Sequence, residues 1–396
     1  MSNFVPIIEN LEQLRMANTN LANAKTAKND EFYTQYRDIQ KEINAYLDFD
    51  PNVFRGKTVL LPCDDPEWSN FTKFFAQHFE LLGLKKLIST SYAPESKKYK
   101  MPYQPTLFET RQPYFDDDKS KTHGKIFVLT EDVSGDGRIN IEDLQWQYLE
   151  GDGDFRSKEI RKLRDEADII VTNPPFSLFR EFVVWLMDSG KQFIIIGNLN
   201  AISYKEVFPL IKDNRMWLGA TGYITDMVFG VPEGTVVKES DKAKAERLGY
   251  IGNYTRLGNS CWFTNVDHGR RHQPLQLMTM ADNFKHSKHK DIRGRKDYIH
   301  YENYDAIEIP YTDAIPSDYE GAMGVPLTFL DKYCPEQFEI IGHPHGDYGL
   351  ELGLKPFPRE LKELNKGLRD GDLYYMMDGK PELPYRRILI RKKQSV

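Results

Sequence analysis

The sequence is poor in cysteine, with Cys63, Cys261 and Cys334 spread over 396 residues. An odd number at such wide spacing excludes a disulfide framework and a zinc-binding pattern, and it is typical of a reducing cytoplasm. No run of eighteen apolar residues occurs, so we expect no membrane-spanning helix. The first residues carry Glu9 and Glu12 instead of a basic-then-apolar leader, which predicts a cytoplasmic protein that is not exported.

Positive charge is not in excess either. Lys and Arg number 53 against 59 Asp and Glu, for a formal net charge of −6. This argues against a small protein that coats nucleic acid through overall positive charge. The charge is nevertheless uneven, because residues 268–296 hold eight Lys or Arg and two Asp, and residues 386–393 hold five basic residues and no acid. A polyanion would therefore be held by local charge in the last third of the chain.

The length and pattern predict a globular α/β protein. At about 150 residues per domain, the chain should form two or three folding units with a sizeable core. Short apolar runs alternate with helical spacings up to about residue 266, which predicts a doubly wound parallel sheet. We expect buried strands at 57–61, 86–90, 125–129, 167–171, 192–196 and 260–264, a hairpin at 216–229, and polar insertions at about 93–122 and 232–258.

The strongest chemical signal is Asn173-Pro174-Pro175-Phe176, directly after the predicted strand at 167–171. Ligands of open α/β sheets sit at the carboxyl ends of strands. Two prolines remove two N–H donors and leave carbonyls to accept, while the Asn173 side chain adds another acceptor. Such acceptors can hold a planar amino group, and Phe176 offers a face for an extruded base. The alternative interpretation is a simple turn after a strand.

This tetrapeptide resembles the Asp/Asn-Pro-Pro-Tyr/Phe motif of adenine-N6 and related amino-group methyltransferases, which use S-adenosylmethionine (AdoMet). Longer stretches are similar to one family, the EcoRI-type adenine-specific DNA methyltransferases. They occur in the family's order from about residue 28 to the C-terminus. These stretches are 30–36, 63–66, 69–71, 83–88, 151–157, 171–181, 204–208, 323–326, 335–338 and 387–390.

The resemblance implies a Rossmann-like AdoMet-dependent methyltransferase sheet with a C-terminal target-recognition region. Residues 1–27 would form an N-terminal helical extension, 28–266 the catalytic domain, and 267–396 the region that recognises DNA. The implied reaction moves the AdoMet methyl group to N6 of a flipped-out adenine in double-stranded DNA. We expect a monomer that acts alone or beside a cognate restriction endonuclease. Methylation of RNA adenine or of a protein glutamine, and a non-catalytic DNA-binding relative, are the alternatives.

The resemblance also implies roles for individual residues. Catalysis would fall to Asn173, Pro174, Pro175 and Phe176, with Asn173 and the Pro174 carbonyl holding the amino group. The implied cofactor-binding residues are Phe32, Tyr33, Thr34, Asp64, Asp65, Asp154, Phe155 and Asn173. The usual glycine-rich loop is missing from 62–68, and no acidic residue follows the strand at 86–90 to bind the ribose. The implied DNA-binding residues are Arg270, Arg271, Lys285, Lys288, Lys290, Arg293, Arg295 and Lys296.

Two competing signals are weaker. Residues 132–143 fit a twelve-residue calcium loop, but Ser134 and Asp143 replace the usual Asp and Glu at its third and last positions. We favour a polar turn there. The four histidines of segment 268–296 are spaced loosely like metal ligands, and without a supporting Cys or carboxylate pattern they favour a solvated basic surface. We therefore expect no metal site.

Overall fold

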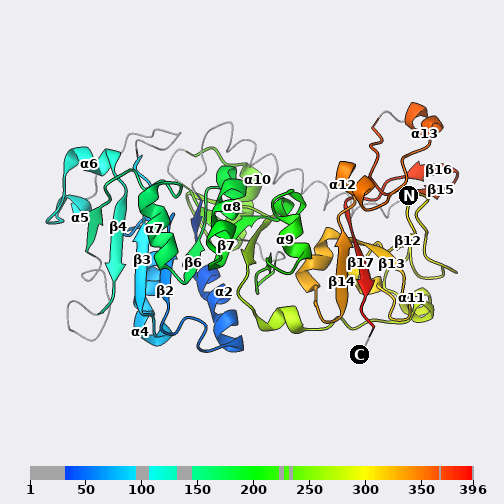
Figure 1. The fold of residues 1–396 in the computed structure, drawn as a ribbon, viewed down its shortest axis with the longest axis horizontal. Helices are drawn as coiled ribbons and strands as arrows, with labels where there is room; N and C mark the ends of the chain where they lie inside the picture. Colours follow the sequence, from blue (N-terminus) through cyan, green and yellow to red (C-terminus); the bar gives the residue numbers. More distant parts are fainter. Residues whose placement is uncertain are drawn as a thin grey trace. The chain divides into compact units, whose positions relative to one another are not determined.

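The structure, a computed structural model, describes residues 32–94, 107–131, 145–222, 227–231, 235–364 and 367–394. The predicted N-terminal extension at 1–27 and the calcium-like loop at 132–143 lie outside these residues. The chain divides into two compact units, one formed by residues up to Val207 with Met216–His268, the other by Phe208–Arg215 with Gly269–Val396 (Figure 1). Within the described part, every helix is too short or too polar to cross a membrane.

An eight-stranded mixed sheet organises the first unit. Its strands are β2 (Thr58–Leu61), β3 (Lys86–Thr90), β4 (Lys125–Leu129), β5 (Trp146–Tyr148), β6 (Ile169–Thr172), β7 (Gln192–Asn198), β8 (Trp217–Leu218) and β11 (Ser260–Thr264). Their spatial order is β5-β4-β3-β2-β6-β7-β11-β8. The central four run parallel, whereas β4 and β11 run antiparallel to their inner neighbours. The α/β class is confirmed, but a wholly parallel sheet is wrong, because a buried apolar run does not encode strand direction.

The order of the strands creates a switch point at β2. The chain passes from β2 to β3 on one side and later returns to β6 on the other side of β2. Connections that diverge in this way leave a crevice at the carboxyl ends of the two strands, where ligands of open α/β sheets bind. Asp64 follows β2 and Asn173 follows β6, so the switch point brings them to the same edge.

Helices cover both faces of this sheet. The helices of the first unit are α2 (Tyr36–Phe49), α3 (Asn70–Gln77), α4 (Phe79–Leu82), α5 (Leu107–Thr110), α6 (Asp117–Thr122), α7 (Lys158–Glu166), α8 (Phe179–Ser189) and α10 (Glu239–Arg247), the last of which packs on β10. Figure 1 shows α7 and α8 together in front of the sheet. A 3-10 turn, η3 (Phe176–Leu178), precedes α8, and Leu178 occupies its N-cap position.

A small sheet, β1-β9-β10, packs beside the main one. It consists of β1 (Tyr33–Thr34), β9 (Val228–Gly230) and β10 (Tyr254–Arg256). The predicted hairpin at 216–229 is therefore wrong, because β8 pairs with β11 whereas β9 pairs with β1 and β10. Both halves of that segment are apolar enough to be buried, and each finds a partner distant in sequence. The predicted insertion at 232–258 contains α10 and β10.

A buried carboxylate anchors α2 to the segment after β8. Glu42 is fully buried and accepts hydrogen bonds from Ala220 N (2.7 Å), Thr221 N (2.8 Å), Thr221 Oγ1 (2.6 Å) and Tyr46 Oη (2.9 Å). Burial raises the pKa of Glu42, and the bonds from Thr221 and Ala220 lower it. A Cβ on Gly219 would lie 2.3 Å from Glu42 Oε1, so only glycine fits there.

Glu42→Gln should lower the free energy of unfolding by about 1–3 kcal/mol, because two donors of Thr221 would then face an amide N–H₂ group. Urea denaturation followed by circular dichroism measures the change. Glu80→Gln is the matched control, since Glu80 is exposed in α4 and should change stability by less than about 0.5 kcal/mol. Equal stability of the two variants would contradict the anchoring role.

The second unit is built on a four-stranded sheet with the order β12-β13-β17-β14. Its strands are β12 (Ala306–Glu308), β13 (Ala322–Pro326), β14 (Phe338–Gly342) and β17 (Arg387–Lys392), and β15 (Tyr375–Met377) pairs separately with β16 (Lys380–Glu382). Its helices and 3-10 turns are α9 (Phe208–Lys212), η5 (Gly269–His272), α11 (Met280–His286), η6 (Thr312–Ala314), η7 (Leu327–Lys332), α12 (Gly346–Glu351) and α13 (Arg359–Leu364).

The basic run at 386–393 is largely part of this sheet. Ile388, Leu389 and Ile390 are fully buried in β17. Arg387 forms a buried ion pair with Glu308 through two 3.0 Å contacts of its Nε. The run is therefore structural over much of its length.

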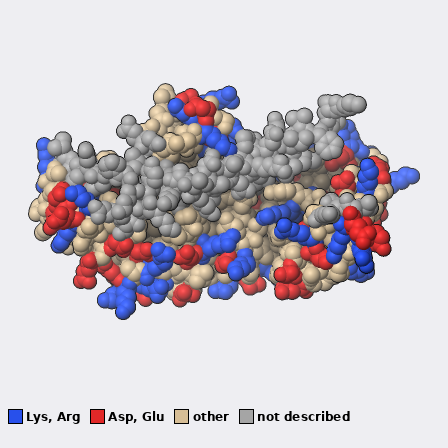
Figure 2. Space-filling view, turned by 90° about the horizontal axis from the view of Figure 1, so that it is seen from above, with Lys and Arg blue, Asp and Glu red and all other residues tan. Residues whose placement is uncertain are grey.

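Figure 2 shows Lys and Arg intermingled with Asp and Glu over the visible described surface, so no single-sign face marks a polyanion site there.

Candidate active site at the carboxyl edge of the sheet

The side chain of Asn173 is oriented by one hydrogen bond and leaves one acceptor unused. Its Nδ2 donates to the Phe32 carbonyl at 2.6 Å. Because a carbonyl only accepts, the amide nitrogen must face Phe32 and the oxygen must face the other way. Asn173 Oδ1 is buried and has no hydrogen-bond partner. Thr34 Oγ1, in the adjoining strand β1, is likewise buried and unpartnered. The site thus presents an oriented acceptor of the kind that holds an amino group.

Three phenylalanines close the site beside Asn173. The ring of Phe176 stacks on that of Phe32, with centroids 5.5 Å apart and an interplanar angle of 24°. The edge of Phe229 meets both rings, at 6.0 Å from Phe32 and 6.4 Å from Phe176. Phe176 keeps only 7% of its surface exposed, so a base could stack on it only after Phe32 moves. The Pro175 carbonyl accepts from Leu178 N at 2.9 Å, which fixes the turn after the two prolines.

Asp64 joins the ends of β2 and β6 across the switch point. One of its carboxylate oxygens accepts from Ser69 Oγ at 2.7 Å and the other from Thr172 Oγ1 at 2.6 Å. The residue is 5% exposed. Burial raises the pKa of Asp64 to about 7, against the lowering effect of the Thr172 and Ser69 bonds, and the charge of Asp65 adds to the rise. Asp65 is half-buried and accepts from Glu67 N at 2.9 Å.

Asp154 approaches the same edge, held by Arg156. Arg156 donates to it from N (2.8 Å), Nε (2.9 Å) and Nη2 (2.7 Å). Burial raises the pKa of Asp154, but the hydrogen bonds from Arg156 have the larger combined effect and leave the pKa below its usual value. Burial and the charges of Asp64 and Asp154 raise the pKa of the Cys63 thiol. These three side chains are therefore within electrostatic reach of one another.

Phe155, an implied cofactor-binding residue, packs against α8. Its ring is 5% exposed and meets Phe182 and Trp185 of α8 edge-on, at centroid distances of 5.1 and 5.7 Å. It therefore belongs to the layer between the sheet and α8. A cleft of about 360 Å³ opens beside it. The cleft is lined by Phe155, Arg156, Arg161, Arg164, Arg180, Glu181, Val184, Trp185, Asp188 and Glu206, a grouping of four arginines with three acidic residues that sequence spacing does not reveal.

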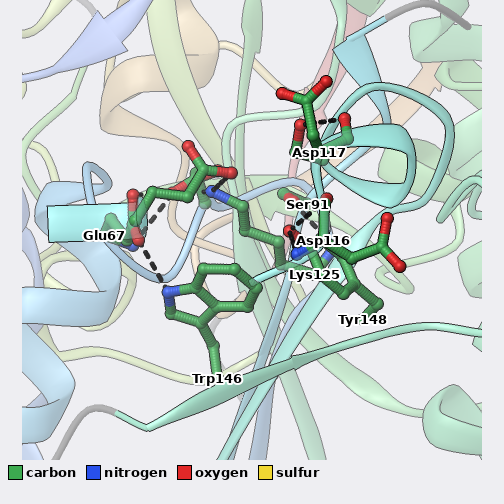
Figure 3. A network of polar contacts seen from close by, with 10 residues as sticks. Glu67, Ser91, Asp116, Asp117, Lys125, Trp146 and Tyr148 are labelled. Carbon is green, nitrogen blue, oxygen red and sulfur yellow. Dashed lines mark hydrogen bonds and ion pairs between the residues drawn. The ribbon is translucent and has the colours of Figure 1, made fainter. Parts of the chain in front are cut away.

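A buried lysine network lies at the start of β4, next to the carboxyl end of β3 (Figure 3). Lys125 Nζ contacts Glu109 Oε1 at 3.1 Å and Glu67 Oε2 at 3.4 Å, and it lies 4.5 Å from the centroid of the Trp146 ring. Trp146 Nε1 donates to Glu67 Oε1 at 2.6 Å. Burial lowers the pKa of Lys125, but the charges of Asp65, Glu67 and Glu109 raise it above its usual value. No sequence pattern predicts this cluster, because its members lie in separate segments.

The basic segment 268–296 contains cations that pair with other described residues and cations that form no such ion pair. Arg270 pairs with Asp331, Arg271 donates to Asn214 Oδ1 at 2.9 Å, and Lys288 pairs with Asp313 at 2.7 Å. Arg295 is half-buried. The remaining four are exposed and form no ion pair with any residue that the structure describes; they are Lys285, Lys290, Arg293 and Lys296. Reversing Arg270 or Arg271 would disturb packing, so the exposed four are the appropriate residues for testing DNA contact.

The triple reversal of Lys290, Arg293 and Lys296 to Glu should weaken binding to all DNA sequences alike. It should also flatten the dependence of log K on log salt, by about 0.9 for each phosphate that is no longer neutralised. Fluorescence anisotropy with a labelled duplex at several salt concentrations measures both quantities. Arg359→Glu, at an exposed position of α13, is the control. An unchanged salt slope in the triple variant would leave the segment as a solvated surface.

Comparison with known proteins identifies the family. The family model described as "Adenine-specific methyltransferase EcoRI" matches residues 20–393. Type II methyltransferase M.EcoRI of Escherichia coli is 38% identical over 375 residues, which covers 94% of this chain and 96% of that protein. Type II methyltransferase M.MpnI of Mycoplasma pneumoniae is 34% identical over 94% of this chain and 98% of its own length.

Type II methyltransferase M.MgeORF184P of Mycoplasma genitalium is 32% identical over 94% of this chain and 98% of its own length. No solved structure matches the chain. The match of the family model runs through both compact units, so it covers the catalytic motif and the C-terminal sheet alike. The resemblance inferred from the motifs is thereby confirmed, and the chain belongs to the EcoRI family of adenine-specific methyltransferases.

Proposed function

We propose that this protein transfers a methyl group from AdoMet to the N6 amino group of an adenine flipped out of double-stranded DNA. Its family is adenine-specific, and its relatives are named type II methyltransferases. The observation that carries the proposal is the buried, unpartnered Oδ1 of Asn173 at the carboxyl end of β6. An acceptor held in this way is complementary to an amino N–H, and it would orient the nitrogen lone pair toward the methyl donor.

The chemistry needs little more than positioning. When bound, AdoMet supplies a methyl group on a cationic sulfur, which is a good leaving group. Asn173 Oδ1 and the Pro174 carbonyl would accept the two amino hydrogens. These two acceptors would hold the nitrogen in line with the methyl group while the demethylated cofactor departs, and the proton that methylation displaces from the amino group would leave to solvent. Because the attacking amine is neutral, no general base is needed before the bond forms, and the protein contributes orientation and charge placement.

The residues at the switch point fit a cationic cofactor. Asp64, Asp65 and Asp154 supply three carboxylates at or near one strand edge. The pKa of about 7 at Asp64 means that a bound cation would complete the stabilisation of its ionised form. We propose that this edge holds the methionine part and the hydroxyls of AdoMet, with Phe32, Tyr33 and Thr34 covering it. Phe155 would act through packing on α8, because its ring is buried there.

For target recognition, we propose that residues 267–396 help to select the DNA word, with the exposed cations of segment 268–296 on phosphates. Arg161 and Arg180, in the cleft beside Phe155, are further candidates for phosphate contact, since neither forms an ion pair with a described residue. We further propose that the enzyme acts as a monomer and protects sites that a cognate endonuclease would cut.

Sequencing of DNA from a methylation-deficient host that expresses the protein tests the function. Methylated adenines should appear within one recurring word, and they should be absent from a host that expresses the Asn173→Ala variant at equal level. Liquid chromatography of hydrolysed DNA and RNA from the same cells separates the two substrates. N6-methyladenine in RNA alone, or in neither polymer, would overturn the proposal.

A further inference from the structure

Some of the buried side-chain atoms without a hydrogen-bond partner lie at or next to the edge that carries Asn173. Besides Asn173 Oδ1 and Thr34 Oγ1, they include Asn259 Nδ2 and Ser260 Oγ. Asn259 is 6% exposed and Ser260 is 1% exposed. Buried polar groups in folded proteins nearly always have a hydrogen-bond partner, so each exception requires an explanation. Asn173 and Ser260 lie at the same edge of the eight-stranded sheet, and Thr34 lies in the adjoining strand β1, so these exceptions point to a partner that binds there.

Strand register brings Ser260 to the same edge as Asn173. β6 and β7 are parallel with Thr172 opposite Ile195, so Asn173 lies level with the last residues of β7. β11 is antiparallel to β7 with Ser260 opposite Asn198, so the first residue of β11 meets the last residue of β7. Only β7 therefore separates the two polar side chains laterally, and Asn259 immediately precedes Ser260.

The two side chains also face the same side of the sheet. Side chains two residues apart on a strand point to the same face. Val171 and Trp262 belong to one hydrophobic cluster, so Asn173, two residues after Val171, and Ser260, two residues before Trp262, face that cluster. Phe32 packs against the same cluster and accepts the Asn173 hydrogen bond, which agrees with this placement.

The start of β11 is held rigidly. The Asn259 carbonyl accepts from Leu199 N at 2.6 Å, and Ser260 N donates to the Leu257 carbonyl at 3.1 Å. Side chains on a fixed backbone are ordered before a ligand arrives, so little entropy is lost on binding. Ser260 offers a hydroxyl that can donate on the face that it shares with Asn173, and Asn259, in the turn before β11, offers an N–H donor at the same edge. An acceptor from Asn173 at the same sheet edge as these donors, one strand away, complements a ligand with an amino group next to a hydrogen-bond acceptor.

Adenine presents this pattern, because its amino group is flanked by the ring acceptors N1 and N7, whereas guanine carries a carbonyl oxygen in place of the amino group. We infer that Asn259 and Ser260 are specificity-determining residues that donate to a ring nitrogen of the flipped adenine while Asn173 takes its amino group. The inference rests on the proposed function, since it assumes that the target base enters at this edge.

The test uses the full-length protein and duplexes that carry the word found by DNA sequencing. The target position holds adenine, 1-deazaadenine or 7-deazaadenine, the last two of which lack one ring acceptor each. Wild-type protein should lose about tenfold in kcat/KM on the analogue that lacks the contacted nitrogen. Ser260→Ala and Asn259→Asp should each lower kcat/KM on the adenine duplex by at least tenfold. For one of the two analogues, the further decrease in kcat/KM relative to adenine should be smaller in each variant than in wild type.

Thr264→Ala is the matched control. Thr264 lies at the other end of β11, and its buried hydroxyl donates to the Phe193 carbonyl at 2.7 Å. This variant should keep the wild-type response to both analogues, whatever its melting temperature. Asn259→Asp preserves shape, so it remains informative if Ser260→Ala folds poorly. Equal sensitivity of wild type and both variants to the analogues overturns the inference, whereas a wild type that methylates no adenine duplex overturns the proposed function instead.

Discussion

The Asn173→Ala enzyme should turn over about 10²- to 10³-fold more slowly than wild type, because one oriented hydrogen bond to the reacting amino group is removed from a site that excludes water. The decrease should appear mainly in kcat, since the bond positions the nucleophile during transfer. Affinity for AdoMet should change little, because in the proposed mechanism Asn173 Oδ1 accepts from the base and not from the cofactor. Single-turnover methylation of a duplex and calorimetry with AdoMet measure these two quantities.

Asn173 has a second role, which the control variant Asn70→Ala separates from base orientation. Asn173 also binds the Phe32 carbonyl, so its removal loosens the segment that leads into β1. Asn70 Nδ2 makes a similar bond to the Thr34 carbonyl in the same segment, at 2.8 Å. Asn70→Ala therefore loosens β1 without removing the acceptor. If Asn70→Ala slows transfer as much as Asn173→Ala does, the effect belongs to the β1 segment and not to base orientation.

Phe176→Ala should behave differently from Asn173→Ala. Stacking of a base on an aromatic ring is worth roughly 1–3 kcal/mol. In this structure the ring is stacked on Phe32, so a base can use it only by displacing that contact. The population of the flipped state therefore depends on the difference in free energy between the base stacked on Phe176 and Phe32 stacked on Phe176. This difference in energy could not be anticipated from the motif, because Phe32 precedes Phe176 by more than one hundred residues.

Local features of the site could be predicted from the sequence. Strands at 86–90, 125–129 and 260–264 have the bounds that the apolar runs predict, and Asn173 follows a buried strand as expected. The direction of β4 and β11 could not be predicted, because a buried strand has the same apolar pattern whether it runs parallel or antiparallel to its neighbour. The antiparallel flanks nevertheless determine the site, since they bring Lys125 and Ser260 to the carboxyl edge.

Pairings across long separations cannot be seen in the sequence either. The bond from Thr172 to Asp64 spans 108 positions, and the bond from Trp146 to Glu67 spans 79. The motif predicts that Asp64 faces the cofactor, but it cannot tell that both of its oxygens already accept from protein hydroxyls. The basic segment 268–296 shows the same limit, because charge counting does not separate the internally paired Arg270 from the exposed Lys290.

The unfolding free energy of the protein should fall as the pH rises from about 4 to about 7, through the ionisation of Asp64. Its folded-state pKa of about 7 lies above the ordinary value of 3.8, so the folded state holds a proton over this interval that the unfolded state has released. The stabilising contribution is complete below pH 4 and is lost as the pH passes through the folded pKa. The slope from this group is at most about 1.4 kcal/mol per pH unit.

Asp64→Asn cannot ionise, so it should remove this slope and make the variant relatively more stable at pH 8 than at pH 5. Urea denaturation at both pH values measures the difference, with Glu80→Gln at an exposed position of α4 as control. Binding of cationic AdoMet at this edge should favour the ionised carboxylate, so wild-type affinity should rise between pH 6 and 8, and calorimetry in buffers of different ionisation enthalpy should detect proton release. Persistence of the full stability slope in Asp64→Asn would show that another group titrates. Proton release that also persists in this variant would remove Asp64 from the cofactor site, because a ligand cannot displace a proton from a side chain that carries none.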